Sequence, residues 1–246
     1  MQEVTAIKHN GNTIWEKTEP IDFFYIKNVS SSSGTVRLYN DSGSSVNINY
    51  SFDGENWNTF NAAVTVQPDE MIYFKGNNPN GFGSSFWQRS YFRSSFDSET
   101  GGYITSLLYS DNYKQLSNIS LPDYAFSRLF IGDTTLVSAD KLVFSQITSI
   151  GVEAFKEMFS GCSALMSSPD LTSITSVGEY GCSQMYTNCS SLTSIYAPTV
   201  VWDTNKFYQW AHLVSASGIF YASSSIVSTI PAGTSGVPSG WTITNI

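Results

Sequence analysis

Charged side chains are scarce in this chain. Asp, Glu, Lys and Arg make up 13% of its 246 residues, whereas about 25% is usual for a soluble domain. The 12 basic residues are outnumbered by 20 acidic ones, which gives a formal net charge of -8. Binding to nucleic acid depends on clustered Lys and Arg that neutralise phosphates. The composition therefore argues against nucleic acid and against anionic membrane surfaces as partners.

Histidine and cysteine are also rare. The two histidines, His9 and His212, lie far apart in sequence, so neither a Ser-His-Asp set nor a zinc site is indicated. The three cysteines, Cys162, Cys182 and Cys189, fit no closed disulfide framework and are expected to be buried thiols. A disulfide between Cys162 and Cys189, which occupy equivalent repeat positions, is also geometrically conceivable. We expect no catalytic residue, metal or cofactor, although a glycosidase that uses two carboxylates would show no local motif.

Long apolar runs are missing as well. No stretch approaches the ~20 apolar residues of a membrane span. The N-terminal segment MQEVTAIKHNGNTIWEK contains no apolar run of the length that a secretory signal needs. We therefore expect no membrane insertion, and release from the cell by a route other than a cleaved signal.

What the sequence does contain is a repeat. AFSRLFIGDTTLVSADKL from Ala125 aligns without a gap with AFKEMFSGCSALMSSPDL from Ala154, and GCSQMYTNCSSLTSIYAP from Gly181 continues the series in a slightly shorter register. A near-constant period of about 27 to 29 residues indicates a solenoid, in which each unit buries its apolar face against the next unit. The expected core residues are Phe126, Leu129, Phe130, Leu136, Leu142, Phe155, Met158, Phe159, Cys162, Leu165, Leu171, Met185, Tyr186, Cys189 and Leu192.

Each repeat combines two patterns. Phe155, Met158, Phe159 and Cys162 follow the spacing i, i+3, i+4, i+7, which predicts a short helix or helical turn. A β-branched, uncharged segment such as LTSITSV then suits a short strand. Ser, Thr, Gly and Pro between the apolar stripes disfavour an ordinary helical bundle. We expect units of helical turn, bend and strand, with Ile219 taking the place of Leu192 in the last unit.

The repeat motifs resemble those of a known family. MFSGCSALMSSPDL and MYTNCSSLTSIYAP are similar to the BspA-type leucine-rich repeat, in which a Met-Phe or Leu-Phe pair is followed by a small residue, Cys, Ser, Leu and then Pro. Upstream, IYFKGNN resembles the end of the Ig-like β-sandwich that often precedes such repeats, and GTSGVPSGWTI resembles their closing sequence. Asp133 departs from the pattern, because it stands where the family has Cys. The resemblance implies a β-rich, non-enzymatic surface or virion protein that binds something.

The N-terminal part predicts strands rather than repeats. The segment around His9-Asn10-Gly11-Asn12 is expected to be a β-hairpin, either the first of the sandwich or an arm that anchors the chain to a neighbouring subunit. Short alternating or aromatic segments then favour an antiparallel sandwich. These expected strands span residues 23–29, 35–40, 46–52, 63–66 and 71–76.

Two aromatic clusters carry the remaining expectations. Residues 77–102 are rich in Gly, Asn and Ser and are expected to be a loop, whose rings lie at the junction of the two halves or stack on sugars. Its aromatic residues are Phe82, Phe86, Trp87, Tyr91, Phe92 and Phe96. At the end of the repeats, Trp202, Tyr208 and Trp210 either close the solenoid or contact a ligand such as a sugar. The final segment is expected to be an extended strand anchored by Trp241.

The sequence thus predicts a mainly β chain in three parts. These are an N-terminal hairpin or anchoring arm over 1–20, an Ig-like antiparallel β-sandwich over 21–102, and a short leucine-rich-repeat solenoid of about three to four units over 103–246, with the lead-in at 103–121 covering its first unit. The expected function is that of a virion surface or fibre-like phage protein that is attached to capsid or tail proteins. Its solenoid is expected to adhere to a host-envelope or mucosal glycan, and a host surface protein is the other partner considered. A bacterial cell-surface or secreted adhesin, a purely structural decoration and a polysaccharide-degrading enzyme are the alternatives. No heptad pattern specifies an oligomer, yet a homo-oligomer is allowed.

Overall fold

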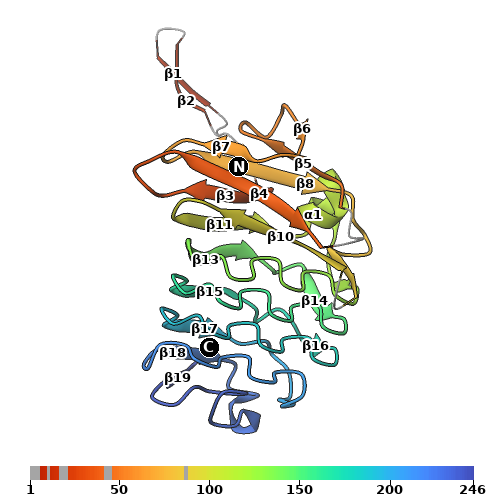
Figure 1. The fold of residues 1–246 in the computed structure, drawn as a ribbon, viewed down its shortest axis with the longest axis vertical. Coiled ribbons are helices and arrows are strands. Elements are labelled where there is room, and N and C mark those ends of the chain that lie inside the picture. The colour runs from red at the N-terminus through yellow and green to blue at the C-terminus, as the bar shows by residue number, and fades with distance from the viewer. Residues whose placement is uncertain (1–5, 10–11, 17–21, 42–45, 86–87) are drawn as a thin grey trace.

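The computed structural model describes residues 6–9, 12–16, 22–41, 46–85 and 88–246. The chain is mainly β and forms an elongated stack, with sheets at the N-terminal end and flat coils below them (Figure 1). At the N-terminal end, β1 (Ala6–His9) and β2 (Asn12–Glu16) pair antiparallel as a sheet of their own. The expected Asn10-Gly11 turn lies outside the described residues. The hairpin belongs to neither of the larger sheets, contrary to one of the two expectations for it.

Two larger sheets follow the hairpin. The first has the order β7-β4-β10-β9, and the second has the order β13-β11-β3-β8-β5-β6. The strands that were expected from the sequence are confirmed as β3 (Phe24–Asn28), β4 (Gly34–Asn40), β5 (Ile48–Ser51), β7 (Val64–Val66) and β8 (Met71–Gly76). The further strands are β6 (Asn58–Thr59), β9 (Gly83–Ser85), β10 (Gln88–Ser94), β11 (Ser98–Tyr103) and β13 (Leu136–Val143).

The two sheets pack on each other through aromatic rings. The Phe92 ring of β10 lies 5.0 Å from the Phe74 ring of β8 and 5.5 Å from the Phe24 ring of β3. All three side chains are fully buried. Such rings bury large apolar areas and fix the spacing of the two layers.

The expectation of a loop over 77–102 is wrong. Residues 83–85, 88–94 and 98–103 form β9, β10 and β11, and only 86–87 lie outside the described residues. At Gly101, close packing requires the absence of a side chain. A Cβ atom on Gly101 would collide with the hydroxyl oxygen of Tyr25, so the Tyr25 ring lies directly over β11. Glycine in a strand often marks such an approach.

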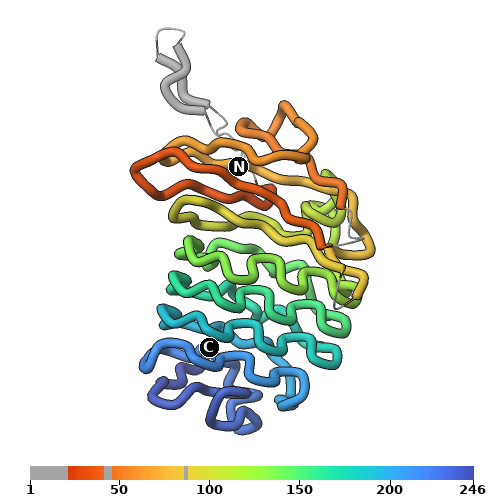
Figure 2. The backbone as a smooth tube through the Cα atoms, in the orientation of Figure 1, coloured from red at the N-terminus to blue at the C-terminus, as the bar shows by residue number. Residues whose placement is uncertain are grey.

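The remaining chain winds into stacked coils, as Figure 2 shows. One face of the stack continues the six-stranded sheet, because β13 pairs in parallel with β11. The parallel strands further along this face are β15 (Ser167–Asp170), β17 (Ser194–Tyr196), β18 (Ile219–Ala222) and β19 (Thr242–Asn245). A second face carries β12 (Ile119–Leu121), β14 (Ile147–Ile150) and β16 (Ser176–Val177). The short helices are α1 (Ser106–Tyr109), η1 (Ser110–Gln115) and η2 (Val227–Thr229).

The expected helical turn in each unit is replaced by consecutive turns. Arg128, Glu157 and Gln184 have φ values of 63°, 54° and 54°, so a left-handed residue interrupts any helix. Alternate N–H groups bond either within the same turn or to the next coil, as in Met158 N to Phe155 O (3.1 Å) and Phe159 N to Met185 O (3.0 Å). The apolar stripe is still buried, because a run of turns presents the same residues to one side. The i, i+3, i+4, i+7 spacing therefore does not distinguish the two structures.

The core follows the repeat register. The rings of Phe130 and Phe159 stack at 5.4 Å, and those of Phe159 and Tyr186 stack at 5.7 Å, with an interplanar angle of 7° in each pair. These are the ring pairs that the sequence alignment places in equivalent positions of successive units. Each of the fifteen expected core residues is at most 3% exposed.

The coil that contains Tyr208 and Ile219 is shorter than expected. Ser183 Oγ donates to Tyr208 O, which lies 25 residues further along the chain, and Ser194 pairs with Ile219 at the same offset. Leu192 is fully buried, whereas Ile219 is 40% exposed on the outer face. Ile219 therefore does not take the place of Leu192, because the offset to this coil is 25 residues rather than the expected 27.

The two sheets, rather than residues 103–121, cover the first coil. Phe82 N donates to Ala125 O at 2.6 Å, and Phe92 N donates to Leu129 O at 2.8 Å. The α1 helix lies instead against β8, and β12 is part of a coil. Sheets and coils thus share one continuous hydrophobic core. The expected boundary between Gly102 and Tyr103 falls inside β11.

Candidate functional site

Two of the three aromatic residues considered as ligand contacts are part of the core. Trp202 is 8% exposed and Trp210 is fully buried, whereas Tyr208 is 49% exposed. Trp202 Nε1 donates to Ser235 O at 2.6 Å, and Trp210 Nε1 donates to Gly236 O at 2.9 Å. Buried indole N–H groups require such acceptors. The ligand-contact expectation is therefore wrong for both tryptophans, which are covered by the later segment that supplies these acceptors rather than closing the solenoid themselves. Of the three residues, only Tyr208 presents its ring to solvent.

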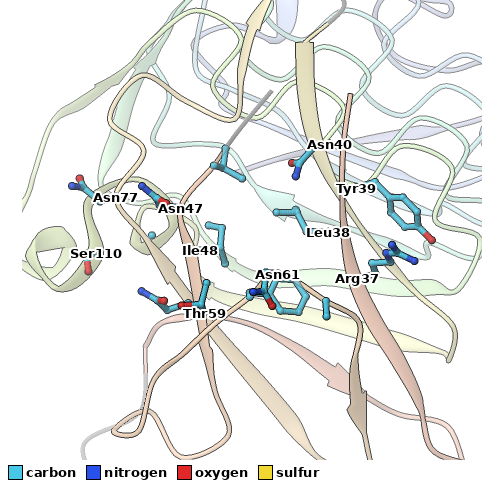
Figure 3. A pocket seen from close by; sticks show the side chains of 15 residues that line it. Arg37, Leu38, Tyr39, Asn40, Asn47, Ile48, Thr59, Asn61, Asn77 and Ser110 are labelled. Carbon is cyan, nitrogen blue, oxygen red and sulfur yellow. The ribbon is translucent and has the colours of Figure 1, made fainter. Parts of the chain in front are cut away.

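A pocket of about 770 Å³ opens between the two sheets, beside β4, β5 and β6 (Figure 3). Its apolar lining residues include Leu38, Ile48 and Phe60, which we call the floor. Ile48 and Phe60 are 3% and 6% exposed and belong to the core. Successive side chains of a strand point to opposite faces, so Leu38 faces the pocket whereas its neighbours Arg37 and Tyr39 face outward, as the figure shows.

The rim of this pocket is rich in amides. Asn78 fixes one side, because its Oδ1 accepts from Asn47 N at 2.9 Å and its Nδ2 donates to Asn47 O at 3.0 Å and to Leu107 O at 2.8 Å. On the other side, Asn40 Oδ1 accepts from Ser90 Oγ at 2.6 Å. The lining residues with an amide or aliphatic hydroxyl group are Asn40, Asn47, Asn49, Asn61, Asn77, Thr59 and Ser110. We call this site the amide-rimmed pocket.

Charge contributes little to the amide-rimmed pocket. Arg37 is the one charged residue among those that line it. Its guanidinium carbon lies 5.2 Å from the centre of the Tyr39 ring, which stacks at 5.4 Å on Tyr91 of β10. The cation is thus held against an aromatic face. The amides of the rim offer hydrogen-bond donors and acceptors without net charge, since each amide supplies both.

A second surface is the outer face of the long sheet. Strand pairing aligns Tyr73, Tyr25, Gly101 and Lys141 in one row, and Asp170, Tyr196, Tyr221 and Thr244 in another. The rings of Tyr196 and Tyr221 stack at 4.3 Å with an interplanar angle of 8°. Burial raises the pKa of Tyr25 and of Tyr196. Because Tyr196 and Tyr221 cover each other's ring faces, this surface presents fewer free aromatic faces than its composition suggests.

Charged groups gather where β10 meets the coils. Arg89, whose side chain is fully buried, lies with its Nη2 3.5 Å from Glu153 Oε2. Lys156 Nζ is 3.1 Å from Glu153 Oε1, and Arg128 Nε is 2.7 Å from Glu157 Oε2. Desolvation, together with the nearby Arg128 charge, lowers the pKa of Arg89 to about 10. Both carboxylates of this cluster have cationic partners. The cluster is suited to joining the sheets to the coils.

The cysteines are buried thiols. Cys162, Cys182 and Cys189 are all free and fully buried, and no disulfide links Cys162 to Cys189. Cys162 Sγ donates to Phe130 O at 3.1 Å, and Cys189 Sγ donates to Phe159 O at 3.0 Å. Burial raises the pKa of all three thiols, and that of Cys189 to about 12. Such thiols act as small hydrophobic groups.

The amide-rimmed pocket is the site that sequence reasoning missed. Its residues come from separate segments of the chain, and the available signal was the density of asparagine between residues 40 and 78. Among the described residues, no group of three or more His, Cys, Asp and Glu side chains is placed to hold a metal ion. In the same residues, no helix has the length and apolarity to cross a membrane. Comparisons with protein-family models, curated proteins and solved structures gave no match.

Proposed function

We propose that this chain is a non-enzymatic surface protein that binds a neutral glycan in the amide-rimmed pocket. The observation that carries the proposal is the pairing of an apolar floor with an uncharged amide and hydroxyl rim. A sugar ring has an apolar C–H face and a periphery of hydroxyls that both donate and accept. The floor suits the first and the amides suit the second. The volume of about 770 Å³ lies in the range of ligand pockets, about 300–1,000 Å³.

The proposed setting is a phage virion, in which the chain is a surface or fibre-like protein attached to capsid or tail proteins. Two features support it: the coil motifs resemble the BspA-type leucine-rich repeat, and the two packed sheets, which are antiparallel except where β13 joins β11, resemble an Ig-like sandwich. Coils whose core rings stack in the register of the sequence repeat suit that family. A bacterial cell-surface adhesin with the same glycan site is the alternative setting, and a purely structural decoration is the alternative without a ligand.

The shared core also supports an adhesive role. Sheets and coils are joined by backbone hydrogen bonds, by the parallel pairing of β11 with β13, and by ring contacts such as Phe82 with Phe126 at 5.8 Å. A rigid rod holds a pocket at a fixed distance from its attachment point. It therefore loses little entropy when it binds, because few groups become ordered.

The test is binding of the full chain to immobilised neutral and acidic polysaccharides from candidate host envelopes. Asn61 and Asn77 are exposed rim residues, so the double variant N61A/N77A should fold normally. Loss of two hydrogen bonds, at roughly 0.5–1.5 kcal/mol each, should weaken binding by about 5- to 150-fold. Ala62→Trp, at another exposed lining residue, should block the pocket.

The matched control is Asn205→Ala, since Asn205 is an exposed asparagine in the coil that contains Tyr208. It should bind as the unmodified chain does. Binding that survives both N61A/N77A and Ala62→Trp would exclude the pocket as the glycan-binding site. If the chain binds no polysaccharide, the purely structural decoration is the remaining hypothesis. Release of reducing sugar ends in the same samples would contradict the non-enzymatic role.

A further inference from the structure

Among the described residues, β19 is the last strand of the coil stack. Strand pairing aligns Ile195, Phe220 and Ile243 in one inward row across β17, β18 and β19. Ile195 and Phe220 are fully buried, whereas Ile243 is 40% exposed. Within the described residues, β19 pairs with β18 on one side and with no strand on the other. The Ile243 side chain is therefore partly in contact with solvent.

An apolar groove of about 610 Å³ lies at this edge. It is lined by Ile230, Val237, Pro238, Trp241 and Ile243, among others. Trp241 is held in place, because its Nε1 donates to Ser215 O at 2.8 Å. The groove is thus preformed in the coil that ends with β19, and its lining is mainly apolar.

No charged side chain protects this end of the molecule. Residues 213–246 contain no Asp, Glu, Lys, Arg or His. Edge strands of monomeric proteins are usually shielded by charges, prolines or bulges. A chain with a net charge of -8 repels its own copies, and this repulsion is weakest between the surfaces that carry the fewest charges. The end of the stack is therefore the surface best suited to contact a second copy.

The backbone of β19 is also complementary to itself. Thr242 N and Ile246 N donate to Gly218 O and Ala222 O, so these even-numbered residues direct their backbone groups toward β18. In a parallel pair the backbone groups of alternate residues face opposite sides. Those of Ile243 and Asn245 consequently face the open edge. An antiparallel copy related by a two-fold axis at Thr244 would place Ile243 opposite Asn245, so that both residues exchange N–H···O bonds with their counterparts.

We propose that the chain forms an end-to-end homodimer in which β19 pairs antiparallel with β19 of a second copy. The contact is isologous, so it closes on itself and generates no filament. The two apolar grooves lie next to each other across the new sheet, and the two N-terminal ends point away. This assembly does not depend on the ligand of the amide-rimmed pocket.

The test uses charge at the two-fold axis. Thr244 lies on the outer face of β19, so Lys or Glu there leaves the monomer core unchanged but places two like charges together in the dimer. By sedimentation equilibrium, the unmodified chain should approach twice its 27.1 kDa mass at about 100 μM, where a dimer with a Kd near 1 μM is largely formed. Thr244→Lys and Thr244→Glu should each raise the Kd about tenfold or more.

An equimolar mixture of Thr244→Lys and Thr244→Glu should recover the dimer, because the charges then attract. Ser120→Lys, on an exposed residue of β12, is the matched control and should dimerise normally. A monomeric unmodified chain at this concentration, or a dimer that neither charge weakens, overturns the proposal. A monomer that instead binds another virion protein at this edge overturns it as well.

Discussion

Removal of the Phe159 side chain should destabilise the whole molecule. The ring is fully buried and stacks on Phe130 at 5.4 Å on one side and on Tyr186 at 5.7 Å on the other. Phe159→Ala leaves a cavity between two coils, and such substitutions cost about 3–5 kcal/mol. This is a large share of the roughly 5–15 kcal/mol that stabilises a typical native protein. The melting temperature should fall by roughly 6–20 °C, at about 2–4 °C per kcal/mol for a chain of this size.

The assay is equilibrium unfolding in urea, followed by circular dichroism and by tryptophan fluorescence. Tryptophan fluorescence reports on both parts of the molecule, because Trp57 lies in the sheet region and Trp202 and Trp210 lie in a coil. Because one core joins both parts, the circular-dichroism and fluorescence transitions should shift together. Phe52→Ala, at a ring that is 39% exposed, is the control and should change the stability by about 0.5 kcal/mol or less. A loss below about 1 kcal/mol for Phe159→Ala, or separate transitions for sheets and coils, would refute the reasoning.

Two further predictions concern buried polar groups. Arg89→Met removes the cation that is fully buried beside Glu153 and should lower the free energy of unfolding by about 3–5 kcal/mol. Lys141→Met is the control: it removes an ion pair in which the lysine is 54% exposed and should lower that free energy by less than about 1 kcal/mol. Equal urea midpoints for the two variants would contradict this. Burial raises the pKa of Cys189 from 9.0 to about 12, so this thiol does not affect the stability below pH 9 and lowers it between pH 9 and 12, by about 1.4 kcal/mol per pH unit. Burial raises the pKa of Cys182 in the same direction. Cys182→Ala should make the decline measured by urea unfolding shallower, and an unchanged slope would argue against ionisation of that thiol.

The repeat register is the part of the fold that the sequence defines best. The period can be read from the positions of Phe130, Phe159 and Tyr186, because each coil must place an apolar ring over the previous one. The local conformation cannot be read in the same way. The left-handed positions are occupied by Arg128 and Glu157, which show little intrinsic preference for that conformation. The hydrogen bonds between coils impose it.

The candidate site depends on contacts between distant segments. The amide-rimmed pocket forms because β4 and β5, which are neighbours in sequence, belong to different sheets. No short pattern reveals that separation. The aromatic cluster at Trp202 and Trp210 was visible in the sequence, but its role depends on acceptors at Ser235 and Gly236 in a later segment. The sequence alone could therefore not predict whether these two rings are buried or exposed.

The two ends of the rod differ in the kind of interaction that they can make. At the N-terminal end, two sheets cover the first coil, and the accessible feature is an uncharged pocket rim of amides over an apolar floor. At the other end, a single strand presents unpaired backbone groups beside an apolar groove within the part of the chain that the structure describes. Amides exchange hydrogen bonds with water and select a ligand by geometry, with a modest net gain in free energy. An apolar edge gains free energy from any surface that excludes water. The first arrangement suits reversible recognition and the second suits lasting assembly, and one shared core holds the two apart.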